Sequence, residues 1–413
     1  MSTRLTVSRL GAQGDGIADT PGGPVFVPFA LPGEIVTASI NKDRADLIAV
    51  IEASSQRVEP PCRHFGTCGG CELQHLEDGA YRAFKRETVV TALRQRGLEV
   101  GVGDLIGCPP ASRRRVTWTA QRTDAGMLLG YRKALSHEIV DIEEDPIAVP
   151  AIEGAIELVR ELATVLCSTQ DAFRLAVSAT ASGLDIAVSG AGEMSAARRQ
   201  KATHFAIANR LARLSCEGEI VVEPQKPQIL IDDISVNLPP GGFLQAVASA
   251  ELAMADLVTG HLKKAKKVAD LFAGIGTFAL RLGRNSMVHA VEGEAGALAA
   301  LDRAFRHAAG LKTITNERRD LTRRPLTWKE LNAFDGLVFD PPRAGAEDQA
   351  RQIARSDIRY VAAVSCNPAT LARDLSILVE GGYRLLSITP IDQFLWSHHV
   401  EAVALLEKPK KRR

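Results

Sequence analysis

Residues 268–278 read VADLFAGIGTF, an apolar run that leads into two closely spaced glycines. This pattern predicts a buried strand, a glycine-rich turn and then a helix, because glycine lets the backbone turn tightly and approach a ligand. The full dinucleotide fingerprint GxGxxG is absent, since only Gly274 and Gly276 are present. The next apolar strand ends at Glu292, whose carboxylate can accept hydrogen bonds from both hydroxyls of a ribose. A nucleoside cofactor without a pyrophosphate therefore fits this turn better than NAD, and a purely structural turn is the alternative.

From about residue 243 onward, apolar strands alternate with helical stretches. The expected strands lie at residues 268–272, 288–291, 336–339 and 360–364. Continuous apolar strands between helices are typical of a parallel, doubly wound sheet. Asp270, together with Glu292 at the end of the next strand, resembles the S-adenosylmethionine-dependent methyltransferases of Rossmann type. The sequence thus predicts an α/β fold for this part of the chain.

The rest of the chain has a different pattern. Residues 1–58 contain about five short alternating runs broken by Gly and Pro turns, which suits a small β-barrel of the oligonucleotide-binding kind or another small barrel such as an SH3-like module. Residues 59–240 mix strands and helices, and the Pro-Pro-Gly-Gly run at 239–242 marks a plausible boundary. We therefore expect a barrel (1–58), a central α+β domain (59–240) and a catalytic domain (241–413).

Composition limits the class of protein. The chain has 413 residues, of which 46% are hydrophobic and 24% charged, as in ordinary globular proteins. It contains no apolar run of about 18 residues and no apolar signal region near its start, so we expect a cytoplasmic protein without a transmembrane helix. Lys and Arg number 50 against 49 Asp and Glu. Any nucleic-acid-binding surface must therefore be local.

Two segments with catalytic potential follow neighbouring expected strands. The run DPPRAG begins at Asp340, directly after the strand 336–339, and Ser-Cys-Asn-Pro places Cys366 at the end of the strand 360–364. Open α/β sheets bind ligands at these carboxyl ends. A cysteine in such a loop is suited to nucleophilic attack, although a strand-end cysteine can also be inert core.

The order of these motifs resembles the RNA uracil-5-methyltransferase family, which makes 5-methyluridine in tRNA or 23S rRNA. The resemblance rests on residues 340–345, 365–368, 371–374 and 399–401, and the N-terminal runs 14–18, 25–28 and 32–34 resemble the RNA-gripping TRAM domain of that family. It implies methyl transfer from S-adenosylmethionine to carbon 5 of a uridine, most plausibly in 23S rRNA, with tRNA as the alternative. A nucleotide-dependent iron–sulfur oxidoreductase and a non-catalytic RNA-binding protein are rival interpretations.

The resemblance also implies roles for individual residues. Cys366 would be the nucleophile that adds to carbon 6 of uracil, and Glu401 the base that removes the proton from carbon 5. His398 and His399 flank that base and compete for its role. Phe243 would stack on the flipped uracil. The residues expected to bind the cofactor are Gln245, Phe272, Thr277 (where close relatives would have Asn), Glu292, Asp320 and Asp340.

Seven cysteines in a long chain disfavour a disulfide framework. Cys62, Cys68 and Cys71 form a tight group whose spacing suits zinc, an iron–sulfur cluster or a redox disulfide. In the family these positions hold a 4Fe-4S cluster. Asp145 stands where the fourth family cysteine should be, so Asp145 or Cys108 would complete the ligand set, or the cluster is incomplete.

Local basic runs identify the expected RNA-binding surface. Arg113–Arg115 and Tyr131–Lys133 combine positive charge with nearby aromatic residues, which suits a single-stranded, unstacked RNA. The target base has to leave its stack to reach Cys366. We expect a monomer that has RNA as its partner.

Overall fold

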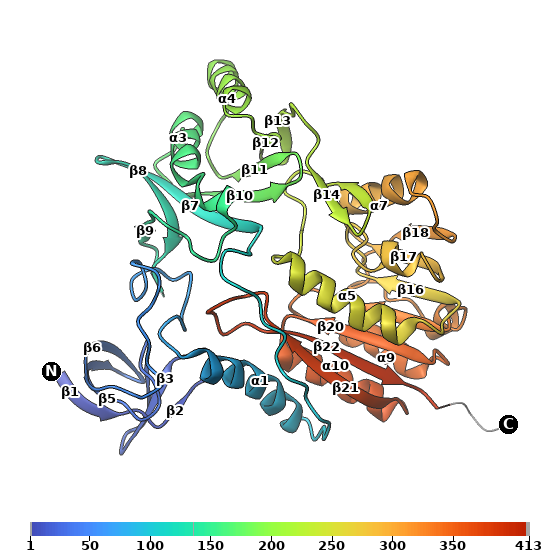
Figure 1. Cartoon of the computed structure of the whole chain (residues 1–413), viewed down its shortest axis with the longest axis horizontal. Coiled ribbons are helices and arrows are strands. Elements are labelled where there is room, and N and C mark those ends of the chain that lie inside the picture. Colours follow the sequence, from blue (N-terminus) through green and yellow to red (C-terminus); the bar gives the residue numbers. More distant parts are fainter. Residues whose placement is uncertain (1, 135, 410–413) are drawn as a thin grey trace.

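The computed structural model describes residues 2–134 and 136–409 of the chain (Figure 1). The C-terminal part is built on a seven-stranded sheet in the order β18-β17-β16-β19-β20-β22-β21. In chain order its elements are α5 (Ala248–Leu262), β16 (Lys267–Leu271), α6 (Ala279–Leu282), β17 (Met287–Glu292), α7 (Ala295–His307), β18 (Ile314–Arg318), α8 (Trp328–Leu331), β19 (Gly336–Phe339), α9 (Glu347–Arg355), β20 (Tyr360–Ser365), α10 (Pro368–Glu380), β21 (Arg384–Ile391) and β22 (Glu401–Glu407).

Strands β16 to β20 of this sheet run parallel, and only β22 lies antiparallel, between β20 and β21. Alternate residues of β16 are buried on opposite faces of the sheet. Val268 lies in the apolar cluster that includes α5 and α7, and Ala269 lies in the cluster that includes α9 and α10. Both faces are covered by helices, which explains why the strands read as continuous apolar runs. The predicted α/β, Rossmann-type fold is confirmed.

The N-terminal part is an all-β module around its own small core. It forms a six-stranded sheet in the order β1-β5-β6-β4-β3-β2. The strands are β1 (Ser2–Thr6), β2 (Arg9–Leu10), β3 (Gly16–Thr20), β4 (Gly23–Val27), β5 (Ile35–Asn41) and β6 (Arg44–Glu52). Val27 and Val36 are fully buried in its core, as the alternating pattern predicts.

The central part holds another seven-stranded sheet, in the order β13-β12-β11-β10-β7-β8-β9. Its elements are β7 (Arg115–Thr123), β8 (Gly126–Arg132), β9 (Ile139–Asp141), α2 (Pro150–Glu153), α3 (Ile156–Leu166), β10 (Phe173–Thr180), β11 (Gly183–Ser189), α4 (Ala196–Ala208), β12 (Arg213–Cys216) and β13 (Glu219–Val222). Trp118 and Phe173 fill its core. This arrangement fits the expected α+β class.

Two segments that precede residue 241 pack on the C-terminal sheet. Helix α1 (Asp78–Arg94) buries Val89 and Leu93 in the same apolar cluster as α10. The hairpin of β14 (Gln228–Ile231) and β15 (Ile234–Asn237) buries Ile229 in the cluster that contains Val268. These contacts cross the predicted domain boundaries at residues 58 and 240. The division of the chain into three domains therefore stays a prediction.

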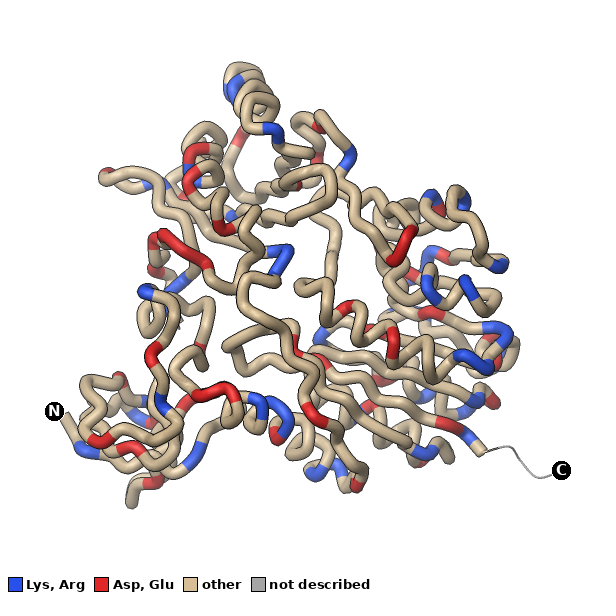
Figure 2. The backbone as a smooth tube through the Cα atoms, viewed as in Figure 1, with Lys and Arg blue, Asp and Glu red and all other residues tan. Residues whose placement is uncertain are grey.

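Figure 2 shows acidic and basic residues interspersed along the described chain. Among the described residues, no helix is both long and apolar enough to cross a membrane.

Candidate active site

A cleft of about 990 Å³ lies at the carboxyl ends of the parallel strands of the C-terminal sheet. Its lining includes residues that directly follow β16, β19 and β20, together with the last residue of β17 and the first of β22. The sheet therefore brings together side chains that are far apart in the sequence, as expected for an open α/β sheet. These side chains are Phe272, Asp340, Cys366, Glu292 and Glu401.

The glycine-rich turn forms one wall of the cleft. Gly274 and Gly276 have φ angles of +55° and +102°, a conformation that other residues rarely adopt. A Cβ added at Gly276 would lie 2.5 Å from Cδ1 of Leu301, so the turn also needs the missing side chain for close packing. The Glu292 carboxylate accepts hydrogen bonds from the backbone N–H groups of Gly274 (2.9 Å) and Glu294 (2.7 Å). Each of its oxygens retains a lone pair for a ligand hydroxyl.

A chain of hydrogen bonds joins two buried carboxylates across the cleft. Gln245 Nε2 donates to Asp340 Oδ2 at 3.1 Å. Gln393 Nε2 donates both to Gln245 Oε1 at 2.9 Å and to Glu401 Oε2 at 2.7 Å. The other oxygen of Glu401, Oε1, is buried and has no hydrogen-bond partner within the described part of the chain.

Burial and mutual repulsion raise the pKa values of these acids. Desolvation raises the pKa of Asp340, and the hydrogen bond from Gln245 offsets part of this rise. Desolvation followed by the Asp340 charge raises the pKa of Glu401, and the hydrogen bond from Gln393 lowers it. Asp270 on β16 is also fully buried, and burial raises its pKa well above the ordinary value, with Asp340 and Glu292 adding to the rise. Such acids favour a positively charged ligand nearby.

Cys366 lies half-buried in the turn that begins α10. Burial raises the pKa of its thiol to about 11, and the charges of Glu401 and Asp340 add to this effect, whereas Arg343 lowers it. The thiol is therefore protonated near neutral pH and has to lose its proton when it reacts.

The two histidines of the cleft rim differ in their contacts. His399 lines the cleft, and burial together with the neighbouring His398 and Arg343 lowers its pKa to about 4. His398 is not among the residues that line the cleft, and its Nδ1 lies 3.2 Å from Oε2 of Glu72. The structure thus brings His399, but not His398, to the cavity that holds Glu401.

Most of the residues expected from the sequence line this one cleft: Phe243, Gln245, Phe272, Glu292, Asp340, Cys366 and Glu401. Thr277 and Asp320 are not among the lining residues. Asp320 is half exposed and accepts hydrogen bonds from the backbone N–H groups of Thr322 and Arg323. The roles given to Thr277 and Asp320 stay predictions.

Sequence reasoning missed the residues that fix the segment before Glu401. Lys85 of α1 donates to Asp392 Oδ1 at 2.6 Å, and both side chains are fully buried. Tyr81 also donates to Asp392, and the carbonyl of Trp396 accepts the backbone N–H of Leu73 at 2.9 Å. The segment 392–400 is thus held between α1 and the cysteine-bearing loop.

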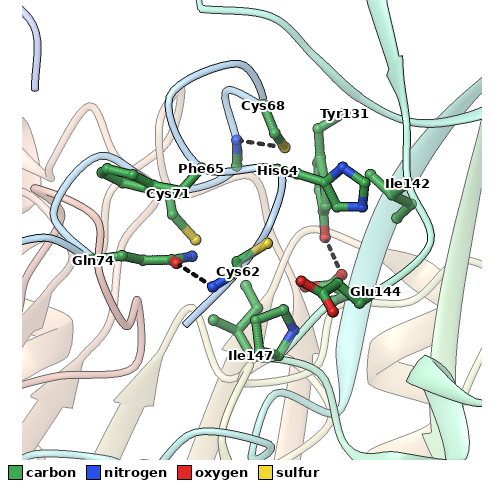
Figure 3. A pocket seen from close by; sticks show the side chains of 13 residues that line it. Cys62, His64, Phe65, Cys68, Cys71, Gln74, Tyr131, Ile142, Glu144 and Ile147 are labelled. Atoms are coloured by element: carbon green, nitrogen blue, oxygen red, sulfur yellow. Dashed lines mark hydrogen bonds between the residues drawn. The ribbon is translucent and has the colours of Figure 1, made fainter. Parts of the chain in front are cut away.

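The three clustered cysteines line a second, smaller pocket (Figure 3). Asp145 lines the same pocket, whereas Cys108 does not. Asp145 Oδ2 accepts hydrogen bonds from Tyr131 (2.8 Å) and Trp118 (3.2 Å). Of the two proposed fourth ligands, the structure therefore brings only Asp145 to the cysteines.

The thiols of this pocket repel one another when they are ionised. Burial, with the charges of neighbouring thiols and of Asp145, raises the pKa of Cys68 to about 11 and that of Cys71 to about 12. Within residues 2–134 and 136–409, no group of three or more His, Cys, Asp or Glu side chains is arranged to hold a single metal ion. Three thiols nevertheless line one pocket together with Asp145, and thiolates are the ligands that iron–sulfur clusters use. The open space is only about 20 Å³, so the side chains would move apart to admit a cluster.

Comparisons with known proteins agree with this architecture. A family model described as tRNA (uracil-5-)-methyltransferase matches residues 225–409, and the TRAM domain model matches residues 3–46. An uncharacterized RNA methyltransferase of Mesorhizobium japonicum is 60% identical over all of both chains. The Halomonas elongata protein named 23S rRNA (uracil(1939)-C(5))-methyltransferase RlmD is 34% identical, over 99% of this chain and 90% of its own.

A solved structure has the same fold over nearly the whole chain. It is the tRNA (uracil-54, C5)-methyltransferase of Pyrococcus abyssi in complex with S-adenosyl-L-homocysteine, with a TM-score of 0.77, 24% identity and coverage of 98% of this chain and 99% of that one. The fold, the cleft and these matches define the protein as a methyltransferase enzyme. The chain belongs to the RNA uracil-5-methyltransferase family and carries an N-terminal TRAM domain.

Proposed function

We propose that the protein transfers a methyl group from S-adenosylmethionine to carbon 5 of a uridine in 23S rRNA. The observation that carries this proposal is that Cys366 and Glu401 line one cleft with the glycine-rich turn, and that Glu401 Oε1 has no hydrogen-bond partner among the described residues. The 23S rRNA target is supported by the named Halomonas relative. A tRNA target is the second candidate, favoured by the family model and by the Pyrococcus structure of the same fold.

The chemistry follows from the poor nucleophilicity of uracil carbon 5. The Cys366 thiol loses its proton to solvent and the thiolate adds to carbon 6. Carbon 5 of the resulting enolate then attacks the sulfonium methyl group, which releases S-adenosylhomocysteine. Glu401 Oε1 then accepts the proton of carbon 5, and the electron pair of that C–H bond re-forms the ring double bond as the thiolate leaves. Arg343 favours the thiolate form of Cys366 at the first and last of these steps.

The methyl donor would lie along the glycine-rich turn, with its ribose hydroxyls on Glu292. Replacing Glu292 with Ala removes charge-assisted hydrogen bonds, each worth roughly 1.5–3 kcal/mol, and should weaken S-adenosylmethionine binding roughly 10- to 100-fold. Isothermal titration measures this loss, and RNA affinity should hardly change. An equal loss of RNA affinity, or a drop in melting temperature, would make Glu292 a structural residue instead.

For the cysteine pocket we propose a 4Fe-4S cluster held by Cys62, Cys68 and Cys71, with Asp145 as the fourth ligand. The support is that these four residues line one small pocket. When bound, the cluster would supply a covalent tether between the loop 62–71 and the central sheet.

RNA would lie across the TRAM domain and the cleft. Arg113 and Arg115 line the cleft beside the exposed Phe243, which leaves charge and an aromatic ring for an unstacked nucleotide. Within the described residues, Arg113 and Arg115 donate to backbone carbonyls, whereas Arg114 forms an ion pair with the Glu251 carboxylate and also donates to the Gln245 carbonyl. We propose three parts with boundaries near residues 58 and 240, and a monomer that acts in the cytoplasm.

Mass spectrometry of rRNA and tRNA from a strain that lacks the gene tests the target. We expect one 5-methyluridine to disappear from 23S rRNA and to return when the purified protein and S-adenosylmethionine are added. Loss from tRNA alone would establish the second candidate. Unchanged 5-methyluridine in both RNAs would overturn the proposal.

A further inference from the structure

We infer that Gln393 is a positioning residue that anchors one oxygen of Glu401, leaves the other free to accept the carbon-5 proton, and links this base to Gln245 on the opposite wall of the cleft. The inference rests on the proposed function, because it assigns a role relative to the proposed base. Gln393 follows β21 by two residues and precedes Glu401 by eight, and it is buried.

The hydrogen bonds leave a single orientation for the Gln393 amide. Its Oε1 accepts the backbone N–H of Ala246 at 3.1 Å, so the Nε2 group must face the two acceptors, Gln245 Oε1 and Glu401 Oε2. A flipped amide would place its oxygen against the carboxylate and its NH₂ group against a backbone donor. Gln393 is therefore a donor toward Glu401 in this network.

The two oxygens of Glu401 thereby become different. Oε2 is held at 2.7 Å by Gln393, whereas Oε1 is buried without a partner in the described residues. A buried carboxylate oxygen without a hydrogen bond is costly unless a ligand or a proton satisfies it. Oε1 is thus the oxygen available to the substrate, and its direction is set by the anchor on the other side.

The same donor favours the ionised form of the base. The hydrogen bond from Gln393 lowers the pKa of Glu401 against the effects of burial and of the Asp340 charge, which raise it. Glu401 must be ionised to accept a proton. Removing the donor should therefore move the acid limb of the turnover profile to higher pH. The Cys366 thiol in the same cleft also has a raised pKa and contributes to this limb in both proteins, so the effect is the shift of the variant relative to wild type.

The chain also connects the base to the cofactor side. Because Gln393 occupies Gln245 Oε1, the Gln245 amide must present Nε2 to Asp340. Loss of Gln393 frees the Gln245 amide to flip. A small loss of S-adenosylmethionine affinity should accompany the pH shift.

The test compares Gln393→Met with a matched control, Gln349→Met. Gln349 is an equally buried glutamine whose amide bonds only the backbone of Leu326, away from the cleft. Turnover is measured from pH 6 to 10 with labelled methyl donor and total RNA from a strain lacking the gene. Gln393→Met should move the acid limb upward by about one to two pH units, the scale of a lost charge-assisted hydrogen bond, and recover toward wild-type turnover at high pH.

Gln349→Met should leave the limb in place. Gln393→His, which restores a ring N–H donor, should return part of the shift. A uniform loss of turnover at every pH by Gln393→Met, or an unmoved limb, would overturn the inference.

A second measurement separates this outcome from failure of the proposed function. In 23S rRNA and tRNA transcribed with 5-fluorouridine, carbon 5 carries fluorine and offers no proton, so methyl transfer should leave protein and RNA covalently joined. Wild type and Gln393→Met should form this adduct equally fast at pH 8 when S-adenosylmethionine is saturating. No adduct from the wild type would overturn the covalent mechanism itself, whereas slow adduct formation by the variant alone would place Gln393 before the proton-transfer step and refute its role through Glu401.

Discussion

Cys366 and Cys68 have thiols of similar acidity in very different surroundings. Burial raises the pKa of both to about 11. Cys366 opens onto a cleft of about 990 Å³ and lies near the cation of Arg343, which lowers its pKa. Cys68 faces a pocket of about 20 Å³, where Cys62 and Asp145 raise its pKa further. Acidic neighbours add to the rise at both thiols, so the comparison teaches that thiol acidity alone does not identify a nucleophile, whereas room for a substrate does.

The largest effect should come from removing the cleft thiol. Cys366→Ala should form no covalent adduct and should lose turnover by about 10⁴-fold or more, the scale of removing a covalent nucleophile. The measurement is methyl incorporation together with a denaturing gel. Cys216→Ala, a buried cysteine on β12, is the control and should remain active. If Cys366→Ala kept turnover near the wild-type level, Cys366 would have no catalytic role and the cleft thiol would not differ from Cys68 in this respect.

Replacing the base should stop the reaction at a later step. Glu401→Gln keeps the shape of the side chain but cannot accept a proton, so turnover should fall roughly 10²- to 10⁴-fold while methylated adduct accumulates. The adduct is visible as a band that contains protein, RNA and labelled methyl together. Because the pKa of Glu401 is raised, wild-type turnover should increase with pH above the range of ordinary carboxylates. Normal turnover by Glu401→Gln would shift the base assignment to His399.

Replacing a cysteine of the pocket should change the metal content of the protein rather than the methyl-transfer reaction directly. Cys68→Ser should reduce the iron of anaerobically purified protein from about four atoms per chain to near zero and lower the melting temperature, because the loop loses its tether. Cys108→Ser is the matched control and should retain its iron, since Cys108 does not line the pocket. Stoichiometric zinc in place of iron would contradict the proposed cluster. The pocket would then still differ from the cleft, because its cysteines would bind a metal.

The smallest effect concerns the fourth ligand. Asp145→Cys should slow the bleaching of the cluster by oxygen, because a thiolate replaces a carboxylate as the iron ligand. The visible absorbance after exposure to air measures this rate. An unchanged rate would mean that Asp145 serves only its hydrogen bonds from Tyr131 and Trp118.

Local patterns predicted the sheet and most of the cleft. Gly274, Asp340 and Cys366 each lie within three residues after the end of a strand, so a parallel sheet brings them to one edge for any conformation of the intervening loops. Gln393 and Asp392 could not be found in this way. Their partners, Gln245 and Lys85, lie 148 and 307 residues away in the chain, and no local periodicity encodes such pairs.

The pair of Lys85 and Asp392 also has a consequence for synthesis on the ribosome. The 307 residues between them take roughly 15–60 s to translate at about 5–20 residues per second. Throughout that time Asp392, the ion-pair partner of Lys85, has not been made, and for most of it α10, on which the apolar side of α1 packs, is also missing. Helix α1 can reach its native position only after the last strands of the protein have emerged, which makes its docking a late event in biogenesis.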